Sequence, residues 1–118
     1  FGNIGKYAVC FNYALRNNNI TTGVVGSKEP NGNGIYDMLG NVNEYCSDWY
    51  DEFDTEPKIN PKGPDNGERK VVKGGNINTY YLNEMNRDSR WPIEVKTKYI
   101  ATGLRLVLTD LNNQVHID

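Results

Sequence analysis

The hydrophobic positions of this chain come in short runs separated by polar, glycine-rich segments. No segment places apolar residues 3.6 positions apart over three turns, so long helices are not expected. Residues 6–15 (KYAVCFNYAL) are apolar and aromatic enough for a strand or a short helix packed on the core. Residues 70–75 (KVVKGG) predict a strand that ends in a glycine pair, where positive φ or close backbone approach is permitted.

Residues 34–50 (GIYDMLGNVNEYCSDWY) combine short apolar pieces with a glycine-asparagine pair. They predict two short strands joined by a tight turn at Gly40 and Asn41. Four aromatic side chains of this segment are expected to pack inward: Tyr36, Tyr45, Trp49 and Tyr50.

The last apolar run, residues 103–110 (GLRLVLTD), has the composition of a core strand. Its alternation places Leu106 and Leu108 on the face opposite Val107. Residues 51–69, in contrast, hold three of the five prolines and are expected to be loop. The pattern as a whole predicts short strands joined by long ordered loops.

The length of the chain sets the number of domains, and its net charge excludes some classes of partner. The 118 residues suffice for one domain, expected to span residues 1–118. A formal net charge of -2 gives no basic field, so nucleic acid is not an expected partner. No apolar run approaches the roughly 20 residues of a membrane span. The chain begins at Phe1 without a signal-peptide pattern and is expected to be a processed product or a piece of something longer.

The two cysteines leave the redox compartment open. Cys10 and Cys46 are able to pair, but two buried free thiols fit the sequence equally well. An extracytoplasmic or cell-surface location is favoured.

The stretch from Asp37 to Glu44 is a candidate ion site. Long loops lose conformational entropy on folding, and a hard cation that gathers loop oxygens offsets this loss. Asp37 and Glu44 supply two carboxylates seven residues apart, and the turn between them lets the carbonyls of Gly40 and Val42 point inward. Calcium takes six to eight such oxygen ligands. The alternatives are acids that are solvated or cap a turn, and an Asn41 that is only a turn residue.

The stretch "PNGNGIYDMLGNVNEYCSDWY" resembles the signature of the formylglycine-generating enzyme family, also called sulfatase-modifying factors. The resemblance continues in order through "NPKGPDNGERKVVKGG" and "TGLRLVL", and upstream through "VVGSKEPN", so that it covers roughly residues 20–108. It implies a variant C-type-lectin-like fold of the α+β class, poor in regular structure and stabilised by calcium. It also implies that the chain corresponds to the C-terminal half of a full family domain. The calcium ligands that it implies are Asp37, Gly40, Val42 and Glu44.

The resemblance does not extend to the oxidase chemistry of the family. Formylglycine-generating members hold copper with two cysteines shortly after the glycine pair, and these positions fall on Thr79 and Glu84 here. Since a hydroxyl and a carboxylate do not replace two thiolates for Cu(I), no copper is expected. The only histidine, His116, offers no basis for an iron site or a nucleophilic triad. The alternative is a fragment of an oxidase or related metalloenzyme whose catalytic residues lie outside this chain.

Residues 76–102 do not follow the family pattern, although predicted strands flank the segment on both sides. Tyrosine, tryptophan and arginine dominate binding hot spots, which makes the segment a candidate site for a protein or glycan partner. The candidate contact residues are Tyr80, Tyr81, Arg87, Arg90 and Trp91. In the structural alternative, Tyr80 and Trp91 lie in the core while Arg87 or Arg90 satisfies carbonyls beneath the loops.

The composition of residues 76–89 adds one further alternative. Variable proteins of diversity-generating retroelements look similar to this family and accumulate Asn, Tyr, Thr, Ser and Asp in this segment, as this chain does. A low-GC genome accounts for the seventeen asparagines equally well. The sequence therefore favours a non-catalytic binding or scaffold module over an enzyme fragment or a retroelement-diversified ligand-binding protein.

Overall fold

The computed structural model describes residues 3–11, 21–53 and 55–107. Four short strands and two 3-10 turns make up the regular structure of this part of the chain. In chain order the elements are η1 (Ile4–Lys6), β1 (Asn43–Trp49), β2 (Arg69–Lys73), η2 (Leu82–Met85), β3 (Trp91–Glu94) and β4 (Thr102–Leu104). The prediction of short strands, long loops and little helix is confirmed.

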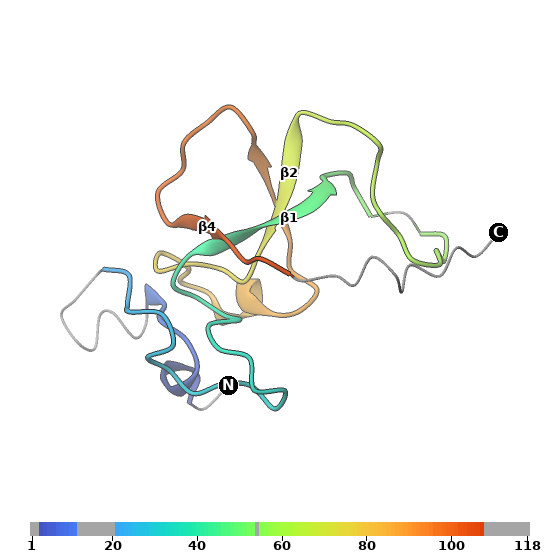
Figure 1. Ribbon diagram of the computed structural model, residues 1–118. Coiled ribbons are helices and arrows are strands. Elements are labelled where there is room, and N and C mark those ends of the chain that lie inside the picture. Colours follow the sequence, from blue (N-terminus) through green and yellow to red (C-terminus); the bar gives the residue numbers. More distant parts are fainter. Residues whose placement is uncertain (1–2, 12–20, 54, 108–118) are drawn as a thin grey trace.

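The strands form one mixed sheet in the order β3-β2-β1-β4 (Figure 1). β2 pairs antiparallel with both β1 and β3, and the pairing with β1 shifts register between Tyr45 and Trp49. β4 pairs in parallel with β1, with Asn43 opposite Thr102. The N-terminal segment and the loops before β1 lie below the sheet in Figure 1, beside the chain around η2.

β2 is the best buried strand because both of its faces are covered. Val71 and Val72 are adjacent in sequence and therefore point to opposite faces, yet both are buried. β-Branched residues suit such a strand, since their restricted side chains pack well on a pleated surface. The strand predicted at residues 70–75 is confirmed up to Lys73, and Gly74 and Gly75 follow with φ of 89° and 72°.

The N-terminal segment contributes alternate residues to two small core clusters. Ala8 and Cys10 pack with Met85, while Val9 packs with Ile77. Val9 also forms an isolated parallel bridge with Gly40. The strand or short helix predicted at residues 6–15 is therefore realised as extended chain around Val9, and residues 12–15 lie outside the described part.

The predicted strand at the start of residues 34–50 is wrong, whereas the second strand is confirmed as β1. Asp37 has a φ of 55°, and a left-handed residue interrupts an extended chain. The turn at Gly40 and Asn41 is confirmed, with φ of 77° and 62°.

The inward packing predicted for the four aromatic residues is also wrong. Tyr36 and Tyr45 are exposed, and Trp49 and Tyr50 are only half-buried. The reason is that basic side chains cover the rings of the last two: Lys70 Nζ lies 3.8 Å from the Trp49 ring centre, and the Arg69 guanidinium lies 5.2 Å from that of Tyr50. Cation–π contacts of this kind satisfy aromatic faces at the surface.

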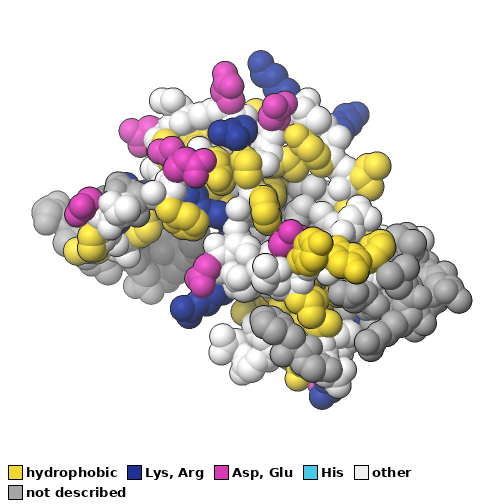
Figure 2. Space-filling view, turned by 180° about the vertical axis from the view of Figure 1, so that it is seen from behind, with side chains coloured by type: hydrophobic (Ala, Val, Ile, Leu, Met, Phe, Trp, Pro, Cys, Tyr) yellow, Lys and Arg dark blue, Asp and Glu magenta, His cyan; other side chains and the backbone are white. Residues whose placement is uncertain are grey.

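The core strand predicted at residues 103–110 is shorter and more exposed than expected. β4 ends at Leu104, and Leu106 and Val107 are 88% and 76% exposed. Both residues lie beyond the end of β4, so the sheet does not hold them against other described elements. Leu108 lies outside the described residues. Figure 2 shows that hydrophobic side chains are widely exposed on the rear face.

Residues 51–53 and 55–68 contain no helix or strand, as predicted for the proline-rich loop. In the described ranges, none of the helical segments has the length and apolar character that a membrane crossing needs.

Candidate ion site and binding segment

The turn at residues 37–44, called the ion-site turn below, connects loops that are distant in sequence. Gly40 approaches the N-terminal segment so closely that a Cβ would lie 2.9 Å from the Val9 carbonyl carbon and closer still to its oxygen. The Gly40 N–H donates to the carbonyl of Gly74 at 2.8 Å. Only glycine meets both the positive φ and the lack of space at this position.

Asn41 is much more than a turn residue. Its side chain is 6% exposed, and its amide exchanges two hydrogen bonds with the backbone of Gly23, at 2.9 Å and 3.2 Å. Its own N–H donates to the Val9 carbonyl at 2.6 Å, and its carbonyl accepts from the Ile77 N–H at 3.0 Å. Asn41 therefore ties together three separate segments of the chain, which the sequence pattern did not indicate.

All four predicted calcium ligands lie on one cavity of about 380 Å³. The cavity also has apolar walls, contributed by side chains of the loop before the turn and of β4. Its lining consists of Val25, Gly26, Tyr36, Asp37, Gly40, Asn41, Val42, Glu44, Leu104 and Arg105. The carboxylate of Asp37 accepts the Gly26 N–H at 2.6 Å, which closes the loop over the cavity.

Arg105 is the cavity residue that sequence reasoning missed. Its guanidinium binds Glu44 through two hydrogen bonds, from Nε at 2.9 Å and from Nη2 at 2.6 Å, and Nη2 also donates to the Asp37 carbonyl at 3.0 Å. The hydrogen bond with Glu44, offset in part by desolvation, raises the pKa of Arg105. Two signals in the sequence marked this residue: it is a single charge inside an apolar run, and it lies in the stretch TGLRLVL that resembles the family.

The donor set of the cavity suits a hard cation. Four residues that line it carry oxygen donors: Asp37 and Glu44 have carboxylates, and Gly40 and Val42 have backbone carbonyls. Within the described ranges no group of three or more His, Cys, Asp or Glu side chains gathers, so an ion here would depend on those carbonyls and on water. Because a carboxylate has about four lone-pair positions, Glu44 can bind Arg105 and a cation together. Calcium accepts such a mixed, irregular oxygen shell.

Residues 76–102, called the binding segment below, carry an exposed tyrosine pair. The rings of Tyr80 and Tyr81 meet edge to face, with centres 5.0 Å apart and an interplanar angle of 79°. Phe11 lies against Tyr80 at 5.3 Å. The two tyrosine side chains are 51% and 61% exposed, so this pair presents flat aromatic area to solvent.

Side chains of Asn86 and of Lys73 hold the backbone of the binding segment at residues 86–89. Asn86 Oδ1 accepts from the N–H groups of Asp88 and Ser89, both at 2.8 Å. Lys73 Nζ, at the end of β2, donates to the carbonyls of Arg87 at 2.7 Å and Ser89 at 3.0 Å. The backbone of residues 86–89 is thus held without the aromatic side chains.

The five predicted contact residues do not form a single cluster. Arg87 is exposed and pairs with the neighbouring Asp88 at 3.3 Å. Trp91 begins β3 and is half-exposed. Arg90 satisfies a backbone carbonyl, as the structural alternative predicted for Arg87 or Arg90. It donates to the Asp51 carbonyl at 2.6 Å and stacks on Phe53 at 3.9 Å from the ring centre.

A second cavity, of about 730 Å³, lies beside Arg90 and the proline-rich loop. Its walls mix rings with charges of both signs, so it offers no single chemistry. It is lined by Asp48, Trp49, Asp51, Glu52, Phe53, Glu56, Lys58, Pro61, Lys62, Gly63, Pro64 and Arg90.

Both cysteines are free, with Cys10 buried and Cys46 half-buried. Burial raises the pKa of the Cys46 thiol, and Lys73 opposes this shift. We expect two thiols per chain under non-reducing denaturing conditions. In the native protein, alkylation should reach Cys46 alone and accelerate as the pH rises, because the thiolate is the nucleophile. Mass spectrometry after iodoacetamide treatment measures both, and a denatured chain without free thiols would contradict this arrangement.

The mixed sheet of short strands and the long ordered loops are those of a C-type-lectin-like domain. The chain belongs to the sulfatase-modifying factor family: residues 3–110 match the model of the sulfatase-modifying factor enzyme 1-like domain. The fold class and the family that the sequence indicated are confirmed.

Two relatives and one solved structure illustrate these similarities. The chain is 40% identical over 58 residues to the formylglycine-generating enzyme of Streptomyces coelicolor, covering 48% of this chain and 18% of that protein. It is 46% identical over 55 residues to the enzyme of Mus musculus, covering 46% and 15%. Its structure resembles Treponema denticola variable protein 1 with a TM-score of 0.75 and 27% identity, covering 87% of this chain and 36% of that chain. The chain therefore spans less than a fifth of these enzymes and about a third of that structure.

Proposed function

We propose that this chain is a non-catalytic binding module of the sulfatase-modifying factor family, which presents the binding segment to a protein or glycan partner. The observation that carries the proposal is the exposed Tyr80–Tyr81 pair. It lies between a turn that the Thr79 hydroxyl closes with the Asn76 N–H and the η2 turn, where the Glu84 N–H donates to the Tyr81 carbonyl at 3.0 Å. Rigid aromatic area costs little entropy on binding, because neither the loop nor the two-torsion side chains need much ordering.

Calcium is part of the proposal as a structural ion. Asp37, Gly40, Val42 and Glu44 would hold it, and its charge would stabilise the gathered carbonyls and carboxylates of the ion-site turn. The turn bonds directly to both ends of the binding segment, through Ile77 and Ala101. A bound ion would therefore support the frame and not the chemistry of a reaction.

The two positions where the resemblance places the copper-binding cysteines are occupied here by Thr79 and Glu84, which have structural roles. The Thr79 hydroxyl accepts the Asn76 N–H at 2.9 Å and closes a turn. Glu84 lies in η2, where it follows the tyrosine pair. This supports a module without the copper oxidase chemistry.

Two other functions have a specific observation in their favour. Similarity to formylglycine-generating enzymes favours a fragment of an oxidase that is completed by other sequence. Similarity to a variable protein, together with the asparagine- and tyrosine-rich binding segment, favours a retroelement-diversified ligand-binding protein. In the first case, coding sequence outside this segment should supply the cysteines or histidines that complete a redox metal site, and only the completed protein with copper should convert a cysteine-containing peptide to an aldehyde. The second requires a repeated, adenine-mutated copy of the coding segment near the gene.

A double substitution tests the binding function. Labelled protein is applied to peptide and glycan arrays, and affinities for the strongest ligands are then measured in solution. Tyr80→Ala with Tyr81→Ala should weaken binding at least about 10-fold, the effect of removing a hot spot. Tyr7→Ala is the matched control, because this tyrosine is also partly exposed but lies outside the binding segment. Equal losses in both variants would contradict the assignment.

A further inference from the structure

We infer that the ion-site turn and the binding segment are energetically coupled, so that a cation in the cavity of about 380 Å³ restrains both ends of the binding segment, with Arg105 as the positioning residue for its C-terminal end. This inference rests on the proposed function, of which it specifies the regulation. It follows from where the hydrogen bonds of the turn go.

The N-terminal end of the binding segment is attached to the middle of the turn. The Ile77 N–H donates to the Asn41 carbonyl at 3.0 Å, and just before it the Gly74 carbonyl accepts from Gly40 at 2.8 Å. Ile77 is buried against Val9, which the same turn holds. A shift of the turn would therefore move the start of the segment.

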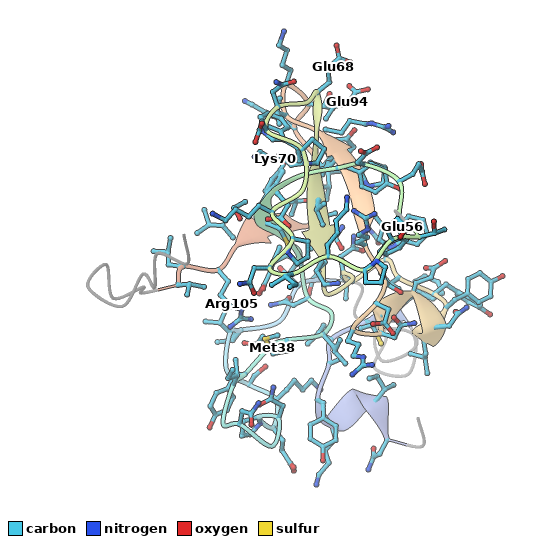
Figure 3. All side chains as sticks on the ribbon, turned by 90° about the vertical axis from the view of Figure 1, so that its right-hand side faces the viewer. Met38, Glu56, Glu68, Lys70, Glu94 and Arg105 are labelled. Carbon is cyan, nitrogen blue, oxygen red and sulfur yellow. The ribbon has the colours of Figure 1, made fainter. Side chains whose placement is uncertain are left out.

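The C-terminal end is attached to the last residues of the turn. The Asn43 N–H donates to the Ala101 carbonyl at 2.8 Å, and β4 then pairs with β1 from Thr102 onward. Directly after β4, Arg105 binds the Glu44 carboxylate and the Asp37 carbonyl. Figure 3 places Arg105 near Met38, at the end of the sheet away from Glu68 and Glu94.

Glu44 takes part both in the cation cavity and in the hydrogen bonds with Arg105. Its two carboxylate oxygens accept from Arg105, and Glu44 also lines the cavity in which a cation would bind. A cation held between Asp37 and Glu44 would fix the acceptor of Arg105, and the intact clamp would in turn orient Glu44 for the cation. Such coupling is reciprocal by thermodynamic necessity.

The centre of the binding segment has separate attachments and serves as an internal reference. β3 pairs with β2, and Lys73 holds the loop before it. A cation in the cavity should therefore slow opening of the two ends more than opening of β3.

Amide hydrogen exchange with calcium as the probe tests this coupling. Calorimetry on the chelator-stripped chain first measures the dissociation constant. At about 100 times that concentration, exchange at Ile77 and at Asn43, whose N–H groups face the two ends, should slow by up to about 100-fold. Amides of Trp91–Glu94 should slow less.

Substitution of Arg105 separates the two ends. In Arg105→Gln the exchange at Asn43 should respond to calcium at least about 10-fold less than in the native chain, while Ile77 still responds. Arg105→Lys keeps the charge without the two-pronged fork and should give an intermediate response. Circular dichroism identifies a variant that fails to fold. In that case the native chain alone still shows whether calcium slows exchange at Ile77 and Asn43 more than at Trp91–Glu94.

The outcomes are distinct. Calcium binding with unchanged exchange at Ile77 and Asn43 would overturn the coupling and leave the ion site standing. An equal slowing at Trp91–Glu94 would also overturn it, since the ion would then only stabilise the whole domain. Absence of both heat and exchange changes would remove the ion site as well as the coupling. The array experiment on Tyr80 and Tyr81 tests the binding function separately.

Discussion

Gly40→Ala should abolish cooperative folding or reduce the free energy of unfolding by at least about 4 kcal/mol. The new Cβ would lie 3.1 Å from the Val9 nitrogen, 2.9 Å from its carbonyl carbon and closer still to its oxygen, with φ at +77°. All three contacts are with backbone atoms of Val9, so no flexible side chain could move aside to make room for the new Cβ. The segment around Val9 would have to separate from the turn, which would break the Asn41 hydrogen bond to Val9. Small domains have about 5–15 kcal/mol of stability in total, so this loss is severe.

Gly34→Ala is the matched control for this steric effect. Gly34 has nearly the same φ, +75°, but nothing lies within 4 Å of the position where its Cβ would be. We expect a loss of only about 1–2 kcal/mol from left-handed strain. Urea unfolding followed by circular dichroism compares the two variants. If they lose equal stability, the close approach of Gly40 to Val9 is not what requires glycine.

Calcium should raise the melting temperature of the chelator-stripped chain by about 10 °C when present at about 100 times its dissociation constant. Binding to the folded state alone contributes about 2.7 kcal/mol at that ratio. For a domain of this size, each kcal/mol shifts the melting temperature by about 4 °C. Differential scanning calorimetry in a calcium series measures the shift.

Two substitutions locate the ion in this experiment. Glu44→Gln should lower the melting temperature without calcium, because Arg105 loses its ionised partner, and should abolish the response to calcium. Glu68→Gln, at the opposite end of the sheet in Figure 3, should leave the response intact. An unresponsive native chain would exclude a calcium site in the ion-site turn.

The local features of the fold could be predicted from the sequence because local rules set them. β2 and the positive φ of its glycine pair follow from two valines and two glycines in a row. The pairing of β4 with β1 was not predictable in this way, since it joins residues about 60 positions apart, such as Asn43 and Thr102. Leu106 is exposed because the strand ends before it, at Leu104, and the alternation of apolar residues does not show where a strand ends.

The candidate site shows the same division. Asp37, Gly40, Val42 and Glu44 were identified together because one turn holds all of them, and the structure brings them onto one cavity. The bond of Arg105 to Glu44, like the stacking of Arg90 on Phe53, depends on tertiary contacts that no local pattern encodes. The residue types suited to binding could be identified from the sequence. Which arginines hold other parts of the chain and which are exposed to a partner could not.

The hydrogen bonds of Asn86 and Lys73 give the loop a supporting skeleton that is independent of its outward side chains. Arg87 and Asp88 can therefore be exchanged for other residues at little cost to folding. A surface of this design can acquire new specificities during evolution while the polypeptide beneath it stays the same.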